Sequence, residues 1–165
     1  MAGTLYLCAT PIGNLEDMTL RVLEILKTSD VIAAEDTRNT RKLLNHFAIQ
    51  TPMTSYHEHN KAVKGPQLVE RLRKGEQIAL VTDAGMPGIS DPGADLVRLC
   101  YAADIPVTVA PGASAAVAAL VLSGLDTRRF VFEGFLPAEK KERRMTLEKL
   151  KKKHRTMIFF EGPHR

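Results

Sequence analysis

The stretch Val81-Thr-Asp-Ala-Gly-Met-Pro-Gly-Ile-Ser-Asp-Pro-Gly93 joins a buried strand to a helix. The apolar run Gln77–Val81 before it predicts the strand, and the pattern of Ala94–Ala103 after it predicts the helix. Its glycines let a ligand approach the backbone closely, and its prolines stiffen the turn. An ordinary loop between a strand and a helix needs only a few residues, so this one is unusually long. The alternative interpretation is a long structural turn. Because ligands bind at the carboxyl ends of parallel strands, the stretch predicts a binding loop.

Strand and helix patterns alternate on both sides of this loop. Strands are expected at residues 4–9, 30–35, 53–56, 77–81 and 105–110, and helices at residues 19–27, 38–47, 63–74 and 94–103, with an Ala-rich helix ending at Ser123. This alternation predicts a parallel sheet covered by helices on both faces. After Gly124, aromatic-rich strands at 129–135 and 156–161 flank a basic helix at 139–153. We therefore expect an N-terminal α/β domain over residues 1–112 and the start of an incomplete second α/β domain over residues 113–165.

The composition favours a soluble protein of a reducing compartment. No apolar run reaches the roughly 18 residues of a membrane span, and the N-terminal residues lack a signal-peptide pattern. Cys8 and Cys100 lie far apart in apolar runs and have the pattern of buried thiols. A cytoplasmic protein without membrane association is the expectation.

Positive charge is concentrated in the last quarter of the chain. Residues 128–165 hold 12 Lys and Arg against 5 Asp and Glu, whereas residues 1–127 hold 11 against 14. The surplus includes Lys140, Lys141, Arg143 and Arg144, and it indicates a polyanionic partner such as nucleic acid. Glutamates interleaved among these cations leave a solvated helix face as the alternative.

Polar or small residues follow three further strands. The loop Ala9-Thr-Pro-Ile-Gly-Asn14 lacks both the G-x-G-x-x-G pattern and the G-K-[ST] pattern, which disfavours NAD and ATP. The run Glu35-Asp-Thr-Arg38 puts two carboxylates at a strand end, where Asp36 or Thr37 could equally cap the next helix. The turn Pro111-Gly-Ala-Ser114 opens the Ala-rich helix and is either a compact turn or a ligand contact.

Two histidines lie in the loop Ser55-Tyr-His-Glu-His-Asn60. A metal would need a third ligand such as His46, and the spacing is not that of a known metal site. We expect no metal and interpret the segment as a surface loop that faces substrate.

Six segments, in this order, carry a resemblance to a known family. They are Leu5–Asp17, Glu35–Arg38 with Thr40–Leu44, Ser55–Asn60, Asp83–Gly93, Pro111–Ser114 and Phe132–Pro137. Together they resemble the tetrapyrrole-methylase (class III) superfamily of S-adenosylmethionine enzymes. Within it they are most similar to the branch that methylates the ribose 2′-hydroxyl of a cytidine in small-subunit (16S) ribosomal RNA. The resemblance covers essentially the whole chain.

The resemblance implies two α/β domains, a methyl donor bound in the cleft between them, and a homodimer when the protein has its full length. The donor-binding residues that it implies are Pro11, Asp83, Ala84, Gly85, Ile89, Ser90, Ser114 and Ala115. With an RNA substrate, the expected RNA-binding residues are Lys140, Lys141, Arg143, Arg144 and His57. Members of the family extend beyond this chain, and they usually have Ser where Gly162 stands.

The chemistry implied is an in-line transfer of the sulfonium methyl group, to which positioning of the reactants contributes most. A general base would add roughly 10²–10⁴-fold. The candidates are Asp83, Glu35, Asp36, His57 and Asp91, and the sequence does not choose among them. Two alternatives stay open: methylation of a tetrapyrrole precursor, whose enzymes carry a Gly-Pro-Gly-Asp run that this chain lacks, and a non-catalytic RNA-binding module.

Overall fold

The computed structural model describes residues 1–162. It contains two compact units, Met1–Ser114 and a second that begins at Ala115. The domain boundary expected from the sequence, between residues 112 and 113, falls two residues before this division. The last three residues of the expected second domain, 163–165, lie outside the described residues.

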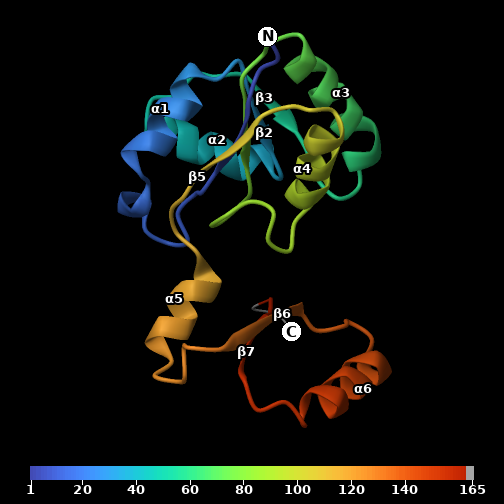
Figure 1. Ribbon diagram of the computed structural model, residues 1–165. Coiled ribbons are helices and arrows are strands. Elements are labelled where there is room, and N and C mark those ends of the chain that lie inside the picture. Colours follow the sequence, from blue (N-terminus) through green and yellow to red (C-terminus); the bar gives the residue numbers. More distant parts are fainter. Residues whose placement is uncertain (163–165) are drawn as a thin grey trace. The chain divides into compact units, whose positions relative to one another are not determined.

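The first unit is a five-stranded parallel sheet with helices on both faces (Figure 1). The strand order is β3-β2-β4-β1-β5. The strands are β1 (Leu5–Cys8), β2 (Val31–Ala34), β3 (Met53–Ser55), β4 (Ile78–Val81) and β5 (Val107–Ala110). The helices are α1 (Leu20–Thr28), α2 (Thr37–His46), α3 (Lys61–Arg73) and α4 (Gly93–Ala102), with a short 3-10 turn, η1 (Leu15–Asp17). The expected parallel α/β architecture is confirmed.

The strand order decides which face each helix covers. From β1 to β2 and β3 the chain moves toward one edge of the sheet, and from β3 to β4 and β5 it moves toward the other. Because such crossovers are right-handed, α1 and α2 cover one face and α3 and α4 the other. The side chains alternate accordingly along β2: Val31 and Ala33 belong to the cluster that includes Leu72 and Leu96, whereas Ile32 belongs to the cluster of α1 and α2.

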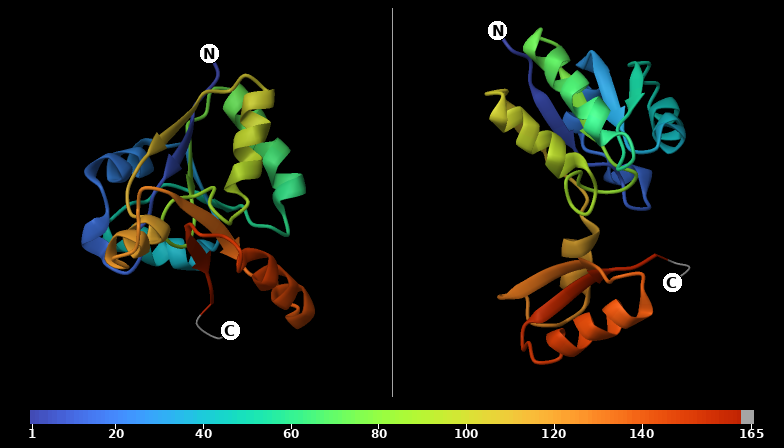
Figure 2. Two further views of the ribbon diagram at one scale, coloured as in Figure 1. Left: turned by 60° about the horizontal axis from the view of Figure 1, so that its bottom comes forward. Right: turned by 90° about the vertical axis from the view of Figure 1, so that its right-hand side faces the viewer.

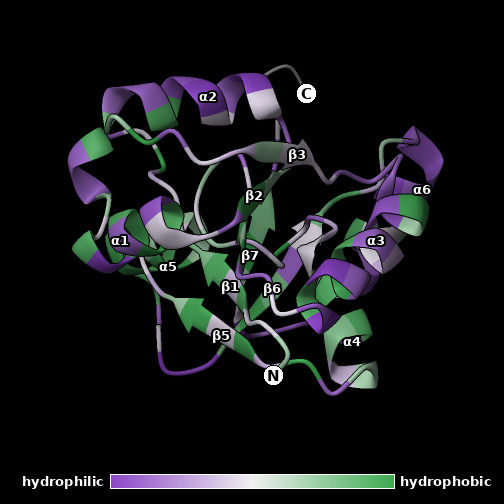
Figure 3. Cartoon of the chain, turned by 90° about the horizontal axis from the view of Figure 1, so that it is seen from above, coloured by the Kyte–Doolittle hydropathy of each residue, from purple (hydrophilic) through white to green (hydrophobic). Residues whose placement is uncertain are grey.

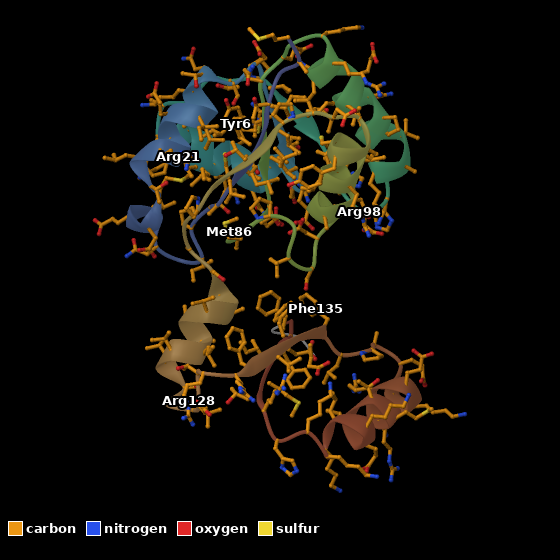
Figure 4. All side chains as sticks on the ribbon, viewed as in Figure 1. Tyr6, Arg21, Met86, Arg98, Arg128 and Phe135 are labelled. Carbon is orange, nitrogen blue, oxygen red and sulfur yellow. The ribbon has the colours of Figure 1, made fainter. Side chains whose placement is uncertain are left out.

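Local chemistry sets the ends of these elements. Asp36 Oδ1 accepts a hydrogen bond from Arg38 N at 2.8 Å, so Asp36 caps α2, as one reading of the sequence predicted. Strand β5 begins at Val107 and not at Ile105, because Pro106 between them has no N–H to give to the ladder. Figure 4 shows the side chains on the ribbon, with Tyr6 of β1 among those that lie toward α1.

The second unit comprises α5 (Ala115–Leu122), β6 (Phe130–Phe135), α6 (Lys140–Leu150) and β7 (Thr156–Phe160). Strands β6 and β7 pair in parallel, with α6 as the crossover between them (Figure 2). The rings of Phe132 and Phe160 pack at 4.9 Å between centroids. Large apolar side chains stay exposed within this unit, among them Leu122, Leu125 and Phe130. The expected aromatic strands and basic helix are present, although α6 ends at Leu150, before the run of lysines.

Candidate functional site

Strands β1 and β4 mark the point in the sheet where the connections diverge. They are neighbours, but the chain leaves β1 toward α1 on one face and leaves β4 toward α4 on the other. Such a switch point opens a crevice at the carboxyl ends of the strands. The loops after β1 and β4 are joined at its base, because Thr10 N donates to Gly85 O at 2.9 Å and Gly85 N donates to Thr10 O at 3.0 Å.

Gly85 is the point where three loops meet. Its φ is +83°, in the left-handed region that favours glycine. A Cβ atom there would lie 3.3 Å from Ile12 Cγ2, in the loop after β1, and 3.4 Å from Ala113 O, in the loop after β5. The loops after three adjacent strands therefore approach one another closely at Gly85, and a side chain there would press against the loops after β1 and β5.

A pocket of about 270 Å³ lies at this edge of the sheet. It is lined by the loop after β1, the end of β4 and the first turns of α2: Thr10, Pro11, Gly13, Leu15, Asn39, Thr40, Lys42, Leu43, Thr82 and Asp83. Of the donor-binding residues that the resemblance implied, Pro11 and Asp83 are among them. Sequence reasoning missed Thr10, Asn39, Lys42 and Thr82. Their positions, directly after a strand or in the first turns of the helix that follows one, were the signal that could have found them.

Buried hydroxyl groups tie together the carboxyl ends of the three central strands. Thr10 Oγ1 donates to Thr82 O at 3.1 Å, and Thr82 Oγ1 donates to Glu35 Oε2 at 2.6 Å. Both threonines are buried, with 3% and 8% of their surface exposed. Because a hydrogen bond to a carboxylate is stronger than one between neutral groups, these two linked hydrogen bonds give the crevice a rigid floor.

Two of the carboxylates proposed as a base are held by other groups. Asp36 Oδ2 lies 2.9 Å from Arg38 Nη2, and these hydrogen bonds lower the pKa of Asp36 to about 2, which makes it a weak proton acceptor. Both carboxylate oxygens of Asp91 lie 2.9 Å from Gly88 N, and Oδ1 also lies 2.7 Å from Gly93 N. Asp91 thus holds the long loop in its conformation.

The remaining candidates lie in different places. Asp83 lines the pocket, is exposed, and accepts a hydrogen bond from Asp36 N at 3.2 Å through Oδ1. Glu35 is half-buried and bonded to Thr82. His57 lies in the loop before α3, away from the pocket lining, and its Nδ1 is a buried atom without a hydrogen-bond partner within residues 1–162. The structure therefore brings Asp83, Glu35 and Asp36 together at the pocket, whereas His57, after β3 at the same edge of the sheet, is not among the residues that line it.

The other residues implied for donor binding form the rim of the crevice or lie at the boundary of the units. Ala84, Ile89 and Ser90 are exposed on the long loop, which also carries Met86, labelled in Figure 4. Ser90 has a φ of +62°, a conformation uncommon outside glycine. Ser114 ends the first unit and Ala115 begins α5 in the second.

The residues expected to bind RNA lie mostly on α6. Lys140, Lys141 and Arg144 are exposed and Arg143 is half-buried. None of the four makes a salt bridge to another residue in the described part of the chain. These cations are therefore accessible within their unit.

Several other kinds of site find no support among residues 1–162. No group of three His, Cys, Asp or Glu side chains in that range is arranged to hold a metal ion. No helix of the range has the length and apolar character needed to cross a membrane. Burial raises the pKa of the Cys8 thiol to about 12 and that of Cys100 to about 11, so neither is a nucleophile at neutral pH.

Comparison with known proteins identifies the family. The family model for tetrapyrrole (corrin/porphyrin) methylases matches residues 4–165. A relative named ribosomal RNA small subunit methyltransferase I, from Halalkalibacterium halodurans, is 59% identical over 99% of this chain and 56% of its own length. The protein of the same name from Bacillus subtilis is 53% identical over 99% of this chain and 56% of its own length.

Solved structures share the fold at low sequence identity. A conserved hypothetical protein from Aeropyrum pernix superposes with a TM-score of 0.72 at 20% identity, covering 99% of this chain and 60% of that one. A uroporphyrin-III C-methyltransferase from Thermus thermophilus gives a TM-score of 0.64 at 19% identity, covering 99% and 72%. This chain spans little more than half the length of the curated relatives described above. The family match over nearly every residue, together with the shared fold, shows that the chain belongs to the tetrapyrrole methylase family.

Proposed function

We propose that this chain carries the donor-binding part of an S-adenosylmethionine-dependent methyltransferase that acts on the ribose 2′-hydroxyl of a cytidine in 16S ribosomal RNA. The observation that carries the proposal is the meeting of the loops after β1, β4 and β5 at Gly85, beside the switch point of the sheet. The relatives named ribosomal RNA small subunit methyltransferase I support the choice of reaction and substrate.

The residues at the crevice fit a donor held mainly by backbone groups. The φ of Gly85 and the close approach of Ile12 and Ala113 disfavour a side chain at this position, so the backbone there is bare. The pocket of about 270 Å³ is smaller than the usual site for a whole ligand, so we expect it to hold one part of the donor. The groups proposed to hold the donor are Pro11, Asp83, Ala84, Gly85, Ile89, Ser90, Ser114 and Ala115. The bound donor would supply an activated methyl group on its sulfonium.

Among the candidate bases, we propose that Asp83 accepts the proton of the ribose hydroxyl. It lines the pocket and is exposed, whereas Asp36 is held by Arg38 and Asp91 by the loop backbone. Asp83→Asn should lower the rate of methyl transfer, measured at saturating donor, by roughly 10²–10⁴-fold. Asp104→Asn, at an exposed position away from the crevice, is the matched control. A rate for Asp83→Asn equal to that of the control would mean that positioning alone suffices.

Two alternatives differ in substrate or in chemistry. A tetrapyrrole precursor carries carboxylates but is small, so it needs cations only around one ring, whereas α6 presents four accessible cations along a helix, as suits a long polyanion. A purely RNA-binding module would leave the meeting of three loops at Gly85 without a purpose. RNA methylation accounts for both features. Homodimer formation and a cytoplasmic location remain predictions from the sequence.

The test is calorimetry with S-adenosylmethionine, NAD and ATP on this chain and on the full-length relative from Halalkalibacterium halodurans. We expect heat only with S-adenosylmethionine, weak for this chain and strong for the relative, because this chain spans 56% of the relative's length and the resemblance implies that both domains contribute to donor binding. Methylated 16S RNA from the relative is then digested to nucleosides, and 2′-O-methylcytidine is the expected product. Preferential binding of NAD or ATP, or a methyl group on a base, would contradict the proposal.

A further inference from the structure

Helix α2 is a basic element in an otherwise acidic unit. Residues 1–114 hold 11 Lys and Arg against 13 Asp and Glu. Within them, α2 carries Arg38, Arg41 and Lys42 and no carboxylate. Figure 3 shows most of this helix in the colour of hydrophilic residues, in contrast to the strands beside it. Its apolar side, with Leu44 buried, packs against the sheet, so the cations lie on the outer surface.

The cations of α2 differ from those of α3 in their pairing. On and next to α3, Lys61 contacts Asp95 at 2.6 Å, Arg71 contacts Glu76 at 2.6 Å, and Lys74 contacts Glu70 at 3.7 Å. On α2, Arg41 and Lys42 are exposed and make no salt bridge within residues 1–162. These two positive charges are thus free to meet an external anion.

The position of α2 places such an anion beside the pocket. The helix begins directly after β2, at the carboxyl edge of the sheet. Lys42 and Asn39 line the same pocket as Thr10, Thr82 and Asp83. Arg38 lies one helical turn before Lys42 and so shares its side of the helix. A positively charged surface therefore extends from the mouth of the pocket along α2.

We propose that the outer surface of α2, formed by Arg38, Asn39, Arg41 and Lys42, binds the phosphate backbone of the RNA beside the nucleotide that enters the crevice. The inference rests on the proposed function and extends it by naming a second RNA contact, on the first unit. A reactive ribose 2′-hydroxyl is next to its own 3′-phosphate, so a ribose at the pocket brings phosphates to its rim. Long cations without interleaved aromatic rings suit phosphates, which fix the register of the RNA without reading its sequence.

The test measures RNA affinity against salt concentration for the 165-residue chain and its double variant Arg41→Ala/Lys42→Ala. The probe is a fluorescently labelled fragment of 16S ribosomal RNA that contains the cytidine methylated by the full-length relative, and the readout is anisotropy. Each phosphate contact to single-stranded RNA contributes roughly 0.7 to the slope of log affinity against log salt. Losing two contacts should lower the slope by about 1.4, which corresponds to roughly 25-fold weaker binding at 0.1 M salt.

The matched control is Arg73→Ala/Lys74→Ala. It removes the same charge at the end of α3, just before β4 and therefore at the opposite edge of the sheet. We expect its slope to match that of the parent. Equal losses in both double variants would show a general charge effect, and an unchanged slope in the α2 variant would show that this surface does not bind RNA. Either result overturns the inference.

Donor calorimetry separates this inference from the proposed function. Lys42 lines the pocket, so the single variant Arg41→Ala, whose residue is not part of the pocket lining, is measured as well. It should lose about 5-fold in RNA affinity at 0.1 M salt and keep the donor affinity of the parent. A chain that binds no donor but shows the α2 salt effect would refute the proposed methyltransferase and keep the RNA surface. The reverse pattern would keep the enzyme and refute the surface.

Discussion

Replacing Gly85 with valine tests whether the meeting point of the three loops is the donor site. The residue has a φ of +83°, and a left-handed backbone costs an L-residue about 1–2 kcal/mol. The new Cβ would lie 3.3 Å from Ile12 Cγ2, which is closer than ordinary contact, and 3.4 Å from Ala113 O, at the lower limit of ordinary contact. Crowding of this kind costs a further 1–3 kcal/mol or so. We therefore expect a loss of about 2–5 kcal/mol in the free energy of unfolding and occlusion of the crevice.

The control for strain alone is Gly75→Val. Gly75 has a φ of +99°, and a Cβ atom there would lie 3.3 Å from Met1 O, at an exposed terminus that can move aside. It follows α3, at the opposite edge of the sheet. Both variants should lose stability, but only Gly85→Val should lose donor binding. Gly85→Ala, which adds a single methyl group, covers the case in which the valine variant does not fold.

The measurements are urea unfolding, followed by circular dichroism, and calorimetry with S-adenosylmethionine at a temperature where each variant is folded. Donor affinity should fall at least 10-fold in Gly85→Val and stay near the parent value in Gly75→Val. If folded Gly85→Val binds the donor as tightly as the parent chain does, the crevice is not the donor site. Equal losses in the two variants would mean that strain, and not occlusion, weakens binding.

Three other predictions follow from the same structure. Tyr56→Phe removes a buried hydrogen bond of 3.2 Å to Pro92 O and should lower stability in urea unfolding by about 1 kcal/mol. Burial raises the pKa of Tyr56 to about 12, whereas the unfolded value is near 10. The neutral Tyr56 side chain therefore stabilises the fold fully below pH 10, and this stabilisation is lost as the pH rises through 12. The parent should lose stability across this range, and Tyr56→Phe should lose less. Replacing Arg143 and Arg144 with alanine should lower the salt slope of RNA binding by up to about two, with donor binding unchanged, and an unchanged slope would make α6 a solvated face only. Residues 1–114 alone should unfold cooperatively, because both apolar clusters of the sheet lie within them.

The order and type of the elements could be predicted because hydrophobic periodicity records burial directly. Strand β2, with every residue buried, appears in the sequence as the apolar run that predicted it. The long loop after β4 was predicted as a binding loop because it follows a buried strand and because its glycines permit close approach of a ligand while its prolines stiffen the turn. The start of β5 was placed too early, since the missing N–H of Pro106 weighs more than the apolar character of Ile105.

The polar floor of the crevice could not be predicted in the same way. The hydrogen bonds from Thr10 to Thr82 and from Thr82 to Glu35 join residues 72 and 47 positions apart. These hydrogen bonds form because β4 lies between β1 and β2 in the sheet. Hydrophobic periodicity does not predict the order of the strands. The structural role of Asp91 could not be predicted for a related reason. A carboxylate in a binding loop suggests a catalytic role, and only the loop conformation shows that it accepts hydrogen bonds from Gly88 N and Gly93 N.

The crevice combines a rigid floor with an exposed rim, and this division fits the proposed site, which would hold a small donor and admit a large substrate. The floor belongs to the sheet: Thr10 and Thr82 are buried and bonded, so their positions are fixed by the same contacts that stabilise the fold. The rim belongs to the long loop, where Ile89 is half exposed and makes little contribution to the core. Changes in the floor should therefore lower stability and binding together, whereas changes in the rim should lower binding alone. Stability and binding are measured separately. Together they distinguish a site whose residues belong to the sheet from a site formed by the loop alone.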